Sequence, residues 1–99
     1  RGTRGDAMST AASLPYDLVL VEWVDASRLA EGWLDLDAIP APYPHRCVTV
    51  GFVVGRNDHA LIVLPTIGDV DHEPNRHGYG GMMIPKSAVL AETRLELAR

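Results

Sequence analysis

The stretch from Gly81 to Leu90 constrains the fold of this chain more than any other part. Its pattern is typical of a strand, a single turn that begins at Pro85, and a second strand. Proline has a fixed φ angle and no amide N–H, so it ends one strand, and the following Lys86 and Ser87 favour a tight helical turn. The sequence therefore predicts a β protein whose last two strands meet at a sharp corner.

Length and composition indicate one small domain. The chain has 99 residues, 46% of them hydrophobic, and a mean hydropathy of zero. We expect one domain over residues 17–99, preceded by a flexible leader or cloning remnant over residues 1–16. A domain of this size buries only about 60–65% of the surface of its unfolded chain, so we expect a homo-oligomer that covers more of it.

Charge and cysteine content limit the ligands and the cellular compartment that we expect for this chain. The formal net charge of −4 opposes tight binding to bulk nucleic acid, although a local basic pocket remains compatible with it. The single cysteine, Cys47, cannot form an intrachain disulfide, which favours a reducing cytoplasm. Apolar runs are far shorter than the roughly 20 residues that cross a bilayer, so no membrane partner is expected.

Hydrophobic periodicity predicts five strands, which are placed at residues 18–24, 47–54, 60–64, 79–84 and 88–95. Strands two and three form a hairpin with turn residues at 55–58. Between strands one and two, Asp25 or Ser27 caps a short helical segment over residues 28–31 that Gly32 closes. One further turn at residues 35–39 precedes three prolines that favour an extended connection. Residues 88–97 also have good helix composition, so a C-terminal helix is the alternative there.

A long polar loop is expected at residues 66–80. It contains five potential metal ligands, namely Asp69, Asp71, His72, Glu73 and His77. Their spacing matches no established zinc motif, so a solvated polar loop is preferred over a metal site or over a loop that closes on a ligand. No metal and no cofactor are expected.

The sequence contains no catalytic signature. Ser87 lacks a His and Asp arrangement, and the proximity of Cys47 and His45 in sequence is not accompanied by an oxyanion site. We therefore expect a protein that is not an enzyme.

Three blocks of sequence resemble a group of small phage-encoded proteins with an Sm-like, SH3-type barrel: residues 21–25, 47–52 and 84–87. The resemblance implies an all-β fold, a small five-stranded SH3/Sm-like barrel with a short helical segment between strands one and two. For a protein of phage type it also implies a location in the cytoplasm of the bacterial host cell. Sm proteins form rings and hold uridines through loop residues. Asn57 and Asp58 occupy a comparable hairpin here, but no arginine adjoins Gly80 and Gly81.

Five residues are the candidate ligand-binding set: Arg56, Asn57, Arg76, Tyr79 and Lys86. Together they combine cationic groups with an aromatic stacking face, which suits a nucleotide or a short single strand. The predicted function is a non-catalytic, oligomeric binding module of phage type, with RNA or a small nucleotide as a candidate ligand. The alternative is a structural or adaptor protein that docks on a host or virion protein. Trp33 is expected to plug the barrel end or a neighbouring subunit.

Overall fold

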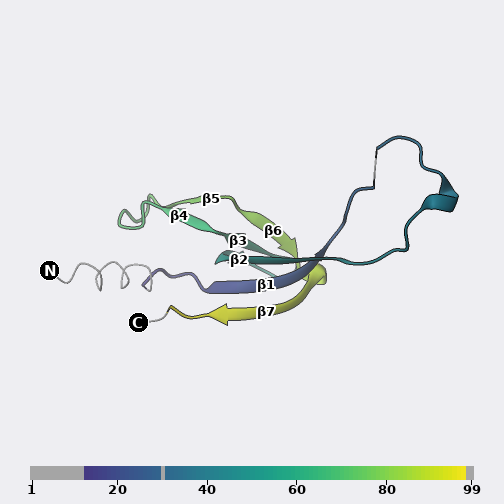
Figure 1. Ribbon diagram of the computed structural model, residues 1–99. Helices are drawn as coiled ribbons and strands as arrows, with labels where there is room; N and C mark the ends of the chain where they lie inside the picture. Colours follow the sequence, from purple (N-terminus) through teal and green to yellow (C-terminus); the bar gives the residue numbers. More distant parts are fainter. Residues whose placement is uncertain (1–12, 30, 98–99) are drawn as a thin grey trace.

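The computed structural model describes residues 13–29 and 31–97, and its strands form one main sheet and one small hairpin (Figure 1). Most of the leader predicted over residues 1–16 lies outside the described residues. In chain order the elements are β1 (Leu18–Asp25), the 3-10 turn η1 (Leu36–Ala38), β2 (His45–Arg56), β3 (Ala60–Leu64), β4 (Thr66–Gly68), β5 (His77–Tyr79), β6 (Met82–Pro85), the 3-10 turn η2 (Lys86–Ala88) and β7 (Val89–Leu95).

The main sheet has five antiparallel strands in the order β6-β3-β2-β1-β7. The register pairs Val21 with Thr49 across β1 and β2, and Leu61 with Ile84 across β3 and β6. Paired residues of antiparallel strands point to the same face, so this register fixes one inner face for the whole sheet. The all-β class is confirmed, and the hairpin of strands two and three is present as β2 and β3.

The inner face carries the hydrophobic core. Six apolar side chains are buried there: Val19, Val21, Trp23, Leu61, Val63 and Ile84. The indole nitrogen of Trp23 donates a hydrogen bond to Thr49 Oγ1 at 3.0 Å, so the largest core side chain leaves no polar atom unpaired. The buried core side chains therefore come from three strands, β1, β3 and β6.

Strand β2 bends sharply, which folds the two halves of the sheet toward each other. At Gly51 an added Cβ would lie 2.7 Å from the carbonyl oxygen of Leu64 and 2.8 Å from Val63 Cγ1. Only glycine allows this close approach. A register shift between Val53 and Gly55 adds an irregularity that turns the strand further.

The sheet is not a closed barrel, so that part of the prediction is wrong. Its edge strands β6 and β7 are joined by η2 but are not hydrogen-bonded neighbours. At the corner, Pro85 has no N–H to donate, and the N–H of Lys86 donates to the carbonyl of His59 at 2.8 Å, next to the Ala60–Pro85 pair of β3 and β6. The corner itself is confirmed, as is a C-terminal strand rather than a helix.

The connection between β1 and β2 differs from the prediction of a short helical segment. Its described residues form no α-helix, although Ala30, inside the predicted segment at 28–31, is not among them. The connection contains a single 3-10 turn, Leu36–Ala38, in which Asp35 Oδ1 accepts a hydrogen bond from the N–H of Asp37 at 3.0 Å. The turn predicted at residues 35–39 is thus present, whereas the prediction of a helical segment between strands one and two is wrong.

The polar region after β3 is more ordered than a simple loop. Thr66–Gly68 and His77–Tyr79 pair as the two-stranded hairpin of β4 and β5, with Thr66 opposite Tyr79. The predicted fourth strand is divided, because Gly80 has a φ of 77° that breaks the chain between β5 and β6. Within the described residues, no helix has the length and hydropathy of a membrane span.

Candidate functional site

The five predicted ligand residues lie at two separate places on the molecule. Arg56, Asn57 and Lys86 lie beside the β2–β3 turn and η2, where Ala60 pairs with Pro85. Arg76 and Tyr79 belong to the β4–β5 hairpin, which continues from the opposite end of β3. The length of β3, about 13 Å at the usual rise per residue, separates the two groups. They do not form one binding surface.

Arg56 forms an ion pair with Glu92 that links β2 to β7. Its guanidinium donates to both oxygens of Glu92 on β7, at 3.0 and 2.5 Å. The hydrogen bond from Arg56 is the largest effect and lowers the pKa of Glu92. Partial burial opposes it as the second-largest effect, and the charges of Arg56 and Lys86 lower the pKa further. The same hydrogen bond raises the pKa of Arg56. This bidentate contact connects β2 to β7, so its role is structural.

The other predicted residues have mostly local partners. Asn57 Oδ1 accepts hydrogen bonds from the N–H groups of His59 and Ala60, at 2.8 and 3.0 Å, and so shapes the β2–β3 turn. Arg76 donates through Nε to the carbonyl of Val70 at 3.1 Å and contacts Glu73 at 3.4 Å. Tyr79 is exposed at the end of β5. Nucleotide binding by this set remains a prediction, which calorimetry with oligo-U at low salt tests directly.

The tip of the β4–β5 hairpin contains the potential metal ligands. Asp69 and His77 lie 3.1 Å apart, between Oδ2 and Nδ1, and Asp69 has a φ of 53°. Among residues 13–29 and 31–97, no group of three or more His, Cys, Asp or Glu side chains is placed to hold a metal ion. The contact between Asp69 and His77 instead joins the two ends of the connection between β4 and β5.

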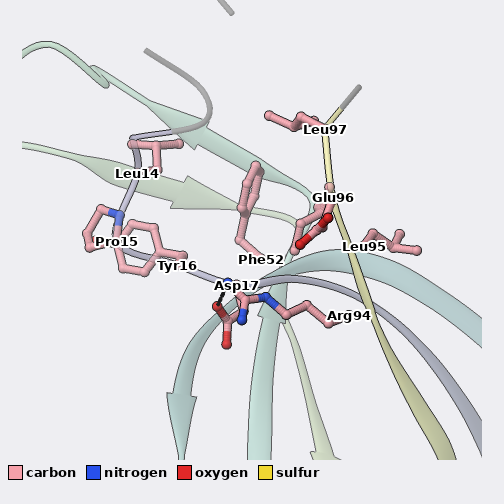
Figure 2. A pocket seen from close by; sticks show the side chains of 10 residues that line it. Leu14, Pro15, Tyr16, Asp17, Phe52, Arg94, Leu95, Glu96 and Leu97 are labelled. Carbon is pink, nitrogen blue, oxygen red and sulfur yellow. Dashed lines mark ion pairs between the residues drawn. The ribbon is translucent and has the colours of Figure 1, made fainter. Parts of the chain in front are cut away.

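A hollow of about 550 Å³ lies where the chain enters β1 and leaves β7 (Figure 2). Phe52 stands between the segment that contains Leu14 and Tyr16 and the segment that contains Leu97. An ion pair between Arg94 and Asp17, 3.4 Å from Nη2 to Oδ1, lies beside it. The lining of this hollow mixes apolar side chains with polar groups, since Glu96 and Tyr16 lie beside the Arg94–Asp17 pair.

The most unusual feature is the connection from β1 to β2. We call its described residues, 26–29 and 31–44, the arm. The arm projects from the sheet and carries η1 near its tip (Figure 1). All of its residues are exposed, and Trp33 is fully so. Trp33 therefore does not plug the end of its own sheet, which corrects one of the two expected positions.

The arm combines exposed apolar side chains with stiffness. Its large exposed apolar residues are Leu29, Trp33, Leu34, Leu36, Ile39 and Tyr43. Prolines at 40, 42 and 44 restrict the backbone on the return to β2. The prolines predict a stiff, extended connection from the sequence, but the sequence does not show that this connection projects from the sheet with Trp33 exposed.

No family model matches the chain, and neither a curated protein nor a solved structure is similar enough to match it. The functional argument therefore depends on the geometry of the arm and the sheet.

Proposed function

We propose that this protein is a non-catalytic docking module that acts in an assembly, with the arm as its contact element. The observation that carries the proposal is the arm itself, a proline-stiffened connection whose six large apolar side chains contact solvent. Exposed apolar groups gathered on one element mark a protein contact, because burying them releases free energy in proportion to the area covered.

The alternative of nucleotide or RNA binding has weaker support. The candidate cations lie in two groups, and Arg56 and Arg76 already have acidic partners. A phosphate backbone requires several free cations along one surface. The docking function, which corresponds to the structural or adaptor alternative, requires only the arm. A phage-type origin remains a prediction from the resemblance of three short sequence blocks.

The register of the sheet offers a clean test. Asp25 and His45 are direct partners at the end of β1 and β2. Residues 26–44 can therefore be replaced by Asn-Gly, a two-residue turn that suits an antiparallel hairpin. We expect this shortened variant to remain folded, by circular dichroism, and to sediment as a monomer where the full chain sediments as an assembly.

Two results would contradict the proposal. The first is a full-length chain that is monomeric at tens of micromolar and binds no protein partner from the host. The second is a shortened variant that assembles as the full chain does.

A further inference from the structure

The outer face of the sheet has an apolar strip that none of the described residues covers fully. We call it the outer strip: Arg46, Val48 and Val50 on β2, with Leu20 on β1. Glu22 on β1 shares this face and is directly paired with Val48, so one carboxylate borders the strip. Val48 is 63% exposed and Val50 is 47% exposed. Leu20 is directly paired with Val50, so these side chains share the face opposite to the core.

This strip departs from the usual pattern of a one-layer antiparallel sheet. Such a sheet normally has apolar residues on its core face and polar residues on its solvent face. In β2 the inward positions contain Cys47 and Thr49, whereas the outward positions contain Val48 and Val50. An apolar outward face indicates a surface that another element covers.

The arm of a second copy has enough apolar surface to cover the strip. With two aromatic rings and four aliphatic side chains, an arm exposes on the order of 800 Å² that could be buried, which is what each partner contributes to a standard protein interface. Each chain has one arm and one strip, so an exchange between copies leaves neither element unmatched.

Charge also favours this pairing. The arm contains Arg28, Glu31, Asp35 and Asp37, which give it two net negative charges. Arg46 at the start of the strip is exposed and forms no ion pair within the described part of the chain. Asp35 is committed to the backbone of η1, so Asp37 is the carboxylate available to a partner.

The arm does not cover the strip of its own chain. It runs away from the sheet beyond the ends of β1 and β2 (Figure 1). Prolines at 40, 42 and 44 hold the returning segment extended, which opposes a fold back onto the same sheet.

We infer that the arm of one copy lies along the outer strip of a second copy, with Asp37 beside Arg46. This inference rests on the proposed docking function and names the surface that receives the arm. Because the arm leaves the sheet beside the Arg46 end of the strip, two copies can exchange arms about a two-fold axis.

A charge exchange in the full-length chain tests the contact. Asp37→Arg places two cations together, and Arg46→Asp places two carboxylates together, so each variant should weaken self-association by at least tenfold in sedimentation equilibrium. The double variant Asp37→Arg with Arg46→Asp restores opposite charges and should recover affinity to within about threefold of the original chain. Lys86→Asp, an equal charge reversal away from the strip, is the control and should leave association unchanged. A double variant no tighter than the weaker single variant overturns the inference.

A second experiment separates failure of the strip from failure of the docking function. Val48→Ser with Val50→Ser should abolish assembly while leaving the melting curve of the dilute protein nearly unchanged. If this variant assembles normally while Trp33→Ala does not, the arm docks elsewhere and only the inference is overturned. If neither change affects assembly, the docking function of the arm fails as well.

Discussion

The inner face of the sheet and the arm each contain six large apolar side chains, but only those of the sheet are buried by their own chain. On the sheet, alternate residues of neighbouring strands point to one side and are close enough to cover one another. On the arm, Leu29, Leu34 and Ile39 line a common hollow, but no other described element packs over them. The comparison shows that apolar composition alone does not produce a core: a core also requires strands in register.

The largest effect is expected at the centre of the inner face. Ile84→Ala removes a fully buried side chain that is paired with Leu61, and it should reduce the free energy of unfolding by about 3 kcal/mol because a cavity remains. Urea denaturation measures the change. Met83→Ala, at the next position on the opposite face, is the matched control and should cost less than about 0.5 kcal/mol in dilute protein. Equal losses for the two variants would contradict the assignment of the core face.

The bend in β2 is expected to have the next largest effect. Gly51→Ala introduces a Cβ against the backbone oxygen of Leu64, which cannot move without disturbing β3, and should cost about 2 kcal/mol by chemical denaturation. Gly68→Ala is the control, because its added Cβ would lie 3.9 Å from the nearest atom, the carbonyl oxygen of His77. A Gly51→Ala variant as stable as the original chain would show that the two halves of the sheet are not in close contact.

The Arg56–Glu92 ion pair should contribute less to the free energy of unfolding. Glu92→Gln should reduce stability by roughly 0.5 kcal/mol at pH 7, since both partners are partly exposed and water screens their attraction. The folded-state pKa of Glu92 is lowered, so this stability is fully present above the unfolded-state pKa of about 4.3 and is lost as the pH falls through the lowered folded-state pKa. Urea denaturation of the original chain and of Glu92→Gln between pH 7 and pH 3 checks that their free energies of unfolding converge as the pH falls. A stability difference that grows toward low pH would contradict a lowered pKa of Glu92 in the folded state.

The smallest effect on folding is expected in the arm. Leu36→Ala should change the free energy of unfolding of the dilute chain by less than about 0.3 kcal/mol, because the side chain is exposed in η1. The same change should weaken assembly measured by sedimentation. A large loss of stability in dilute protein would mean that the arm packs on its own sheet, which would remove the contrast between the two regions.

Some features follow from local chemistry and were therefore predictable from the sequence. Pro85 lacks an N–H, so the chain must turn at the end of β6, and the corner appears as η2. The alternation of residues 18–24 predicts β1, and turn residues at 55–58 predict the β2–β3 hairpin. The prolines of the arm predict an extended connection. Each depends only on residues close in the chain.

Other features depend on distant partners, and only the tertiary structure decided them. Both sets of alternate residues in β2 are apolar enough to face a core, and the pairing with β1 and β3 turned Cys47 and Gly51 inward and Val50 outward. The partner of Arg56 is Glu92, 36 positions along the chain, and no local pattern indicates this ion pair. The open edge between β6 and β7 likewise follows from the strand order of the sheet, in which β6 pairs with β3 and β7 pairs with β1. Local sequence patterns specify where strands and turns lie. The buried face of each strand, the closure of the sheet and the partners of charged side chains depend on which strands meet in space.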